Sequence, residues 1–188
     1  MKFKIAIQNL KFYILSFSFA FCILSFTFTC YAQESKSEPV IVNGDKVEYS
    51  TDSREVTVTG NAEVISKGAK LTCEKLTLNT QTKEAEAYGN ARLDDQKGVI
   101  EGKKIIYNFQ NKTGIIIDSE FRSNPYFGKA EKVDKVSEAE FIARRGYMST
   151  CSYDNPHYRI KSRKIIFFPG DKVQTKDDTV YVGKIPML

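Results

Sequence analysis

The chain has 188 residues, with 28 Lys and Arg against 23 Asp and Glu, which gives a formal net charge of +5 at pH 7. Three of the lysines lie in the first 32 residues, which hold no acidic residue, so the remaining 25 basic side chains exceed the acidic ones by two. This weak basicity, without an aromatic-interleaved basic stripe, argues against nucleic-acid binding. A single histidine, His157, and the lack of a Gly-rich phosphate loop or a Gly-x-Ser-x-Gly motif argue against an enzyme, a cofactor and a metal site.

Residues 1–32 are predicted to be a secretory signal peptide. A lysine-bearing start precedes an uncharged run over residues 12–31, and Cys30-Tyr31-Ala32 matches a cleavage site before Gln33. The apolar run is longer than the roughly 7–15 residues of a usual signal, so an uncleaved membrane anchor is the alternative. Lipidation at Cys30 is a weaker one, because Phe28-Thr29 does not match the small residues expected before it.

The rest of the chain is expected to form a leader and one domain. Residues 33–39 are polar and are predicted to be disordered. Residues 40–188 are long enough to bury a core of their own.

Three copies of one pattern occupy residues 46–64, 75–93 and 104–122, at a strict 29-residue interval, and a looser fourth copy covers residues 164–182. Self-similarity at a fixed period indicates stacked supersecondary units that bury a shared core. Apolar and polar residues alternate within each copy, and this period of two predicts β-strands.

Glycine and asparagine mark where these strands bend. Gly60-Asn61 and Gly89-Asn90 recur at the same place in the first two copies, and both residue types tolerate positive φ, so a sharp turn or bulge is expected there. Short strands are predicted on either side of each bend. Residues 132–143 are interpreted as a loop followed by a strand, and the acidic pairs Asp94-Asp95 and Asp177-Asp178 are placed in turns.

The alternation predicts one apolar face, which needs a second sheet to cover it. We therefore expect an all-β fold: an open β-jelly roll, a V-shaped two-sheet stack of short antiparallel strands. In the third copy, Ile106 and Ile116 are assigned to the outer face. The residues assigned to the inner face include Val47, Tyr49, Val56, Val58, Val64, Leu76, Leu78, Leu93, Ile105, Tyr107, Phe109, Ile115, Ile117 and Phe121.

Two cysteines, Cys73 and Cys151, remain after removal of the predicted signal peptide. An oxidising compartment would permit a disulfide between them. Cys73 lies on the inward phase of its strand, however, where a small buried thiol is the simpler interpretation. Stacked units contact only their neighbours, and the two cysteines are about two repeats apart, so no bond between them is expected.

The predicted signal peptide, the hairpin repeat with Gly-Asn-Ala bends and the segment Gly146–Cys151 together resemble the OstA-like family of lipopolysaccharide transport. That family includes the periplasmic bridge protein LptA and the N-terminal periplasmic domain of the LPS-assembly protein LptD. Residues 147–188 are most similar to the latter, through Ser149-Thr150-Cys151 and Val182-Gly183-Lys184-Ile185-Pro186. An LptD would continue into a β-barrel, so the chain is expected to be either a fragment or a free-standing domain of that descent.

The resemblance implies a periplasmic domain, associated with the outer membrane, that conducts lipopolysaccharide with the acyl chains in an apolar trough. The inner-face residues named above would then form the lipid path. Expected partners are lipopolysaccharide, LptA-like or other OstA-like proteins joined by edge-strand pairing, and an outer-membrane β-barrel with its lipoprotein partner. The resemblance also makes Cys151 a disulfide candidate, because it matches the family cysteine that bonds to the barrel.

Two other readings stay open. One is a free-standing periplasmic β scaffold or adhesin-like module with a fully packed core. The other is a secreted carbohydrate-binding β-solenoid, which would usually show a ladder of exposed aromatics. Tyr49, Tyr107 and Phe109 are assigned to the inner face, and this counts against the solenoid.

Overall fold

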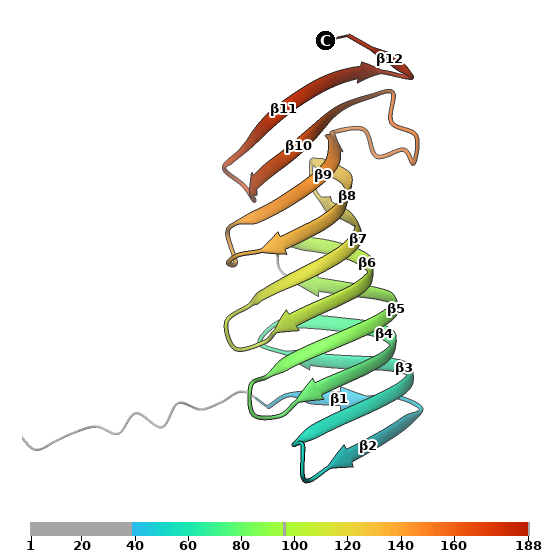
Figure 1. Ribbon diagram of the computed structural model, residues 1–188, viewed down its shortest axis with the longest axis vertical. Coiled ribbons are helices and arrows are strands. Elements are labelled where there is room, and N and C mark those ends of the chain that lie inside the picture. Colours follow the sequence, from blue (N-terminus) through green and yellow to red (C-terminus); the bar gives the residue numbers. More distant parts are fainter. Residues whose placement is uncertain (1–38, 96, 188) are drawn as a thin grey trace, which may run out of the picture. The chain divides into compact units, whose positions relative to one another are not determined.

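The computed structural model describes residues 39–95 and 97–187, and every regular element in these ranges is a β-strand (Figure 1). The all-β fold class is therefore confirmed, while the predicted signal peptide and nearly all of the leader lie outside the described residues. The strands are β1 (Ile41–Asn43), β2 (Lys46–Ser50), β3 (Glu55–Ser66), β4 (Ala69–Asn79), β5 (Glu84–Asp95), β6 (Gly98–Asn108), β7 (Thr113–Ser123), β8 (Tyr126–Lys135), β9 (Phe141–Ser149), β10 (Tyr158–Phe168), β11 (Lys172–Val182) and β12 (Ile185–Pro186).

The described strands form one open antiparallel sheet, stacked in chain order from β3 to β12 (Figure 1). At the N-terminal end, β1 and β2 both pair with β3: β2 pairs with residues 55–59 and β1 with residues 63–65. Antiparallel neighbours need only a short connection, so each hairpin of the repeat becomes two adjacent rungs of the stack.

Each long strand bends near its middle, and the bends divide the sheet into two walls. For example, residues 55–59 of β3 pair with residues 75–79 of β4, and beyond a bulge residues 62–66 pair with residues 69–73. Wall A comprises residues 46–50, 55–59, 75–79, 84–88, 104–108, 113–117, 132–135, 141–144, 164–168 and 172–176. Wall B comprises residues 41–43, 62–66, 69–73, 91–95, 98–102, 119–123, 126–130, 146–149, 158–162 and 178–182.

The Gly-Asn pairs form bends, as the sequence predicts. Gly60 and Asn61 have φ of 76° and 46°, and Gly89 and Asn90 have φ of 75° and 44°. Between the pairings Tyr88–Lys104 and Ala91–Gly102, two residues of β5 face one residue of β6, which is a β-bulge. The short strands predicted on either side of these bends are thus the two halves of one long strand, and the V is one continuous sheet folded along its bends.

The inner faces of the two walls pack against each other with a period of two. On either side of the bend in β4 and β5, buried side chains alternate with exposed or half-exposed ones. Fully buried residues such as Val58, Leu71 and Leu76 come from both walls. Burial of these apolar faces, at about 25 cal/mol per Å², is the main stabilising term for such a stack.

The third copy of the repeat has a different phase from the one predicted, so the inward assignment of Ile115 and Ile117 is wrong. Ile116 is fully buried opposite Ile105, whereas Ile115 and Ile117 are half-exposed on the outer face. The 29-residue interval places Ile116, not Ile115, at the position of Val58. The bend of β7 then has Asp118 (φ 50°) in place of a Gly-Asn pair, which shifts the second half of the strand and returns Phe121 to the interior.

Two further expectations need correction. Residues 132–135, predicted as loop, form the end of β8, and the loop begins at Val136. Asp177 and Asp178 lie inside β11 rather than in a turn, because Asp177 (φ 58°) forms the bend of that strand.

Candidate functional site

The interior between the walls is apolar along the described stack. Around β3–β6 it is closed, because small side chains such as Ala85, Ala87 and Ala91 let the walls approach; these three side chains have no exposed surface. Close packing of this kind leaves few voids larger than a water molecule. This part of the interior is a packed core in the structure.

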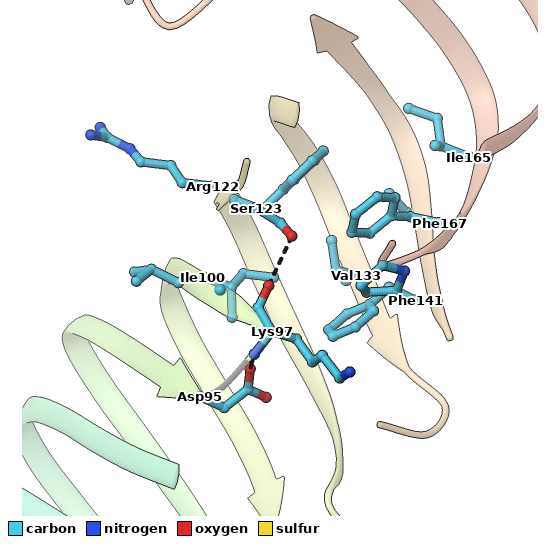
Figure 2. Close-up of a pocket in the computed structure, with 14 residues that line it drawn as sticks. Asp95, Lys97, Ile100, Arg122, Ser123, Val133, Phe141, Ile165 and Phe167 are labelled. Atoms are coloured by element: carbon cyan, nitrogen blue, oxygen red, sulfur yellow. Dashed lines mark hydrogen bonds between the residues drawn. The ribbon is translucent and has the colours of Figure 1, made fainter. Parts of the chain in front are cut away.

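Further along the stack, a small apolar pocket separates the walls (Figure 2). Its volume is about 40 Å³. A single water needs about 10–15 Å³, so the pocket has room for little more than a few methyl-sized groups. The pocket is too small for the acyl chains that the resemblance implies unless the walls move apart. The lining residues are Asp95, Lys97, Gly98, Val99, Ile100, Phe121, Arg122, Ser123, Val133, Phe141, Ala143, Ile165, Phe167 and Pro169.

An aromatic cluster around Phe167 connects the two walls at this pocket. The ring of Phe167, in wall A, lies 6.4 Å from that of Phe121 and 5.5 Å from that of Tyr126, both in wall B. Phe141 of wall A completes the cluster at 6.2 Å. Offset and edge-on pairs at these separations are favourable, so the cluster adds to the apolar contacts that hold the two walls together here.

Polar groups gather at the rim of the pocket, where the β5–β6 turn meets the end of β8. The backbone amide of Lys97 donates to Asp95 Oδ1 at 2.8 Å, and Ser123 Oγ donates to the Lys97 carbonyl at 2.8 Å (Figure 2). The ammonium of Lys135 lies 2.9 Å from Asp95 Oδ2. Burial raises the pKa of the Tyr107 hydroxyl, and the nearby carboxylates of Asp95 and Glu138 raise it further.

Most of the inner-face residues predicted from the sequence are buried between the walls, and one of them, Phe121, lines the pocket. Val47 and Tyr49 share the inward phase but are 50% and 60% exposed, because β2 is an end strand with β3 on one side only. Val56 is partly buried against the core. The predicted residues with at most 2% exposure are Val58, Val64, Leu76, Leu78, Leu93, Ile105, Tyr107 and Phe109.

Sequence reasoning missed most of the pocket. Ile165 and Phe167 could have been found, because they occupy the positions of Ile105 and Tyr107 in the fourth copy of the repeat. Val133 and Phe141 belong to a hairpin that the period does not reveal. Lys135 is polar, and no hydrophobic pattern could have placed it in the interior.

The two cysteines of the described residues are both free thiols. Cys73 is buried on the inner face, as expected, and burial raises its pKa to about 11. Cys151 is partly exposed, and its Sγ lies 3.5 Å from Nδ1 of His157. The described residues contain no cluster of three or more potential metal ligands. Within residues 39–95 and 97–187 there is no candidate for a membrane-spanning helix.

A comparison with solved structures defines the class of fold. The chain is similar to the crystal structure of LptH, the LptA-homologous periplasmic component of the lipopolysaccharide transport device of Pseudomonas aeruginosa. The match has a TM-score of 0.53 at 19% sequence identity and covers 70% of this chain and 95% of the other. The described residues therefore form an open β-jelly roll of the LptA-like type.

Sequence comparisons identify the family. Residues 26–119 match the model of the lipopolysaccharide-assembly, LptC-related family, and the chain belongs to this family. The chain is also 30% identical over 135 residues to the LPS-assembly protein LptD of Cupriavidus pinatubonensis (strain JMP 134 / LMG 1197). The aligned region covers 71% of this chain and 16% of that protein. The resemblance of the sequence to proteins of lipopolysaccharide transport is confirmed, and membership of this family agrees with the expectation that the chain is not an enzyme.

Proposed function

We propose that residues 40–188 form a periplasmic domain that conducts lipopolysaccharide toward the outer membrane, with the acyl chains held between walls A and B. The observation that carries this proposal is the apolar interior to which both walls contribute, with the pocket beside Phe121, Phe141 and Phe167. Each methylene buried there contributes about 0.8 kcal/mol, so an interior that opens can hold acyl chains without covalent chemistry. The sugar part of the lipid would stay in water outside the walls.

Photo-crosslinking tests this path. We would replace Phe121 or Tyr107, on the inner face, with p-benzoylphenylalanine and irradiate the protein with lipopolysaccharide. Ile117, half-exposed on the outer face, is the matched apolar control, and Thr57 is a polar one. Labelling confined to the inner positions supports the path, whereas equal labelling at Ile117 contradicts it.

The same experiment addresses the alternative of a β scaffold with a packed core. The closure of the interior around β3–β6, where Val58 and Leu76 are fully buried, is what that alternative predicts. A scaffold would give no lipid adduct at Phe121 or at Tyr107 under conditions where a known lipopolysaccharide carrier is labelled.

We also propose that the two ends of the stack join other OstA-like proteins by edge-strand pairing. At one end β2 carries the exposed Val47 and Tyr49, and at the other Val182 and Ile185 are 53% and 67% exposed. An edge strand with exposed apolar side chains is a template for another strand. Val182→Lys together with Ile185→Lys should abolish co-purification with an LptA-like partner and leave the circular dichroism spectrum unchanged.

Periplasmic location is proposed from residues 1–32, which would be removed on export. Intact mass measurement of the protein from a periplasmic extract tests it: a mature chain beginning at Gln33 supports the proposal. Retention of the full N-terminus in the membrane fraction would support the anchor alternative.

A further inference from the structure

The ion pair between Lys135 and Asp95 differs from the sheet contacts around it, because it crosses from one wall to the other. Lys135 is the last residue of β8, at the rim of wall A, and Asp95 is the last residue of β5, at the rim of wall B. Their side chains meet at 2.9 Å over a separation of 40 residues. In the sheet, β6 and β7 lie between these two strands.

The pair lies at the edge of the pocket and is almost dry. The Lys135 side chain is 1% exposed and that of Asp95 is 17% exposed. The ammonium also lies 4.2 Å from the centre of the Phe141 ring, and both Phe141 and Asp95 line the pocket. Separation of two buried charges is unfavourable, because each charge is then left without a partner in a poorly solvated site.

The other ion pairs of the described residues do not join the rim of wall A to the rim of wall B. Lys103 and Asp118, at 2.8 Å, join the neighbouring strands β6 and β7 at their bends, and their side chains are 81% and 46% exposed. Lys112 and Glu138, at 2.7 Å, join two connections at the rim of the same wall. Neither of these pairs bridges the two rims.

Separation of the rims needs no backbone bond to break. The sheet hydrogen bonds join strands that follow one another in the chain, and each bond lies within one wall. A hinge motion at the bends therefore leaves these bonds intact. Beside the pocket, only side-chain contacts between the two walls oppose this motion. Among these contacts, the Lys135–Asp95 pair is the ion pair.

We propose that the Lys135–Asp95 ion pair is a latch that holds the two rims together over the pocket and must break for a lipid acyl chain to enter. This inference rests on the proposed function for its cargo. The latch itself is a property of the protein without lipid, because the pair sets how often the rims separate.

Lipid loading is the first test. p-Benzoylphenylalanine at Phe121 reports arrival of lipopolysaccharide, and the rate of adduct formation is compared among Lys135→Met, Asp95→Asn and the charge swap Asp95→Lys with Lys135→Asp. A closure free energy of about 1.4 kcal/mol corresponds to tenfold in the open population, so the single variants should load about tenfold faster. The swap should return to the wild-type rate, and Lys103→Met should not change it.

Distance measurement between the rims is the second test and needs no lipid. We would attach spin labels at two exposed positions, one on each rim. Asn124 lies in the β7–β8 turn of wall B, and Ala139 lies in the β8–β9 loop of wall A. Cys151→Ser removes the accessible native thiol. Lys135→Met should extend the distance distribution to longer values, and Lys103→Met should leave it unchanged.

The outcomes separate the latch from the cargo. Equal loading rates and equal distances in wild type and Lys135→Met would overturn the latch, and so would slower loading, which would make Lys135 an anion-binding group instead. Absence of lipid adducts in all variants, with rims that open in Lys135→Met, would overturn the proposed function and leave the latch standing.

Discussion

The side-chain amide of Asn90 donates a hydrogen bond to the carboxylate of Glu74, with Nδ2 2.6 Å from Oε1, and so ties the bend of β5 to the bend of β4. Each non-glycine bend residue of positive φ in β3, β5, β7, β9 and β11 has a hydrogen-bonded or oppositely charged side chain as partner on the preceding segment. The pairs are Asp45–Asn61, Glu74–Asn90, Lys103–Asp118, Glu131–Arg145 and Arg163–Asp177. A row of side-chain pairs therefore follows the line along which the two walls meet.

Gly89→Ala should destabilise the fold at this line. Gly89 has φ of 75°, where a Cβ costs about 1–2 kcal/mol. The added Cβ would also lie 2.7 Å from Cδ and 3.0 Å from Cβ of Glu74. Gly170→Ala is the matched control, since Gly170 has φ of 79° and no heavy atom within 4 Å of the added Cβ. Urea unfolding should show a larger loss for Gly89→Ala; equal losses would mean that the Glu74 contact has no cost.

The phase of β7 predicts opposite behaviour of two adjacent isoleucines. Ile116→Ala should cost about 2–5 kcal/mol of unfolding free energy, because it leaves a cavity in the closed interior. Ile117→Ala, on the half-exposed outer face, should cost about 1 kcal/mol or less. Chemical denaturation of the two variants decides the matter, and a larger loss for Ile117→Ala would mean that the strand has the phase first expected from the sequence.

Cys73 predicts a loss of stability at high pH. Its pKa is raised by burial to about 11 in the folded state, against about 8.5 in an unfolded chain. The folded state thus holds the proton more tightly, and the resulting stability, on the order of 3 kcal/mol, is complete below pH 8.5 and is lost as the pH rises through 11. The difference in unfolding free energy between wild type and Cys73→Ala should follow this profile, and a difference that is constant from pH 7 to 11 would contradict it.

The same burial predicts which thiol reacts. At pH 8, Cys151 should react promptly with a thiol-specific reagent in the native protein, because it is partly exposed, whereas Cys73 should react only after unfolding. Peptide mapping after a short pulse of alkylation measures both. Equal modification of the two residues would show that the interior near Cys73 opens on the timescale of the pulse.

Lys135→Ala should be far more destabilising than Lys103→Ala. Loss of Lys135 leaves Asp95 without its charged partner in a largely buried site, which should cost about 3–5 kcal/mol. Lys103 is well exposed, and its replacement should give no measurable change. Thermal unfolding of both variants at equal concentration tests this contrast.

The sequence determines some of these features directly and hides others. A period of two and the Gly-Asn bends are local properties, so the all-β class, the bends of β3 and β5 and the inner faces of β3–β6 could be predicted from them. The 29-residue interval also gives the phase of the first half of β7, since it places Ile116 at the position of Val58. The second half is shifted by the bend at Asp118, which replaces the Gly-Asn pair, and the alternation alone does not give the size of that shift. The contact between Lys135 and Asp95 arises from the folding of one wall over the other, which local alternation does not encode.

Sequential pairing of the strands also makes the length of this protein adjustable. Because each rung is bonded to the rung before and the rung after it, a hairpin gained or lost at an end changes no other connection. Neighbouring strands are about 4.8 Å apart, so each hairpin adds roughly 10 Å to the interior. A gene that gains or loses repeats of this kind can therefore lengthen or shorten the passage between the walls in steps of one hairpin, without a new fold.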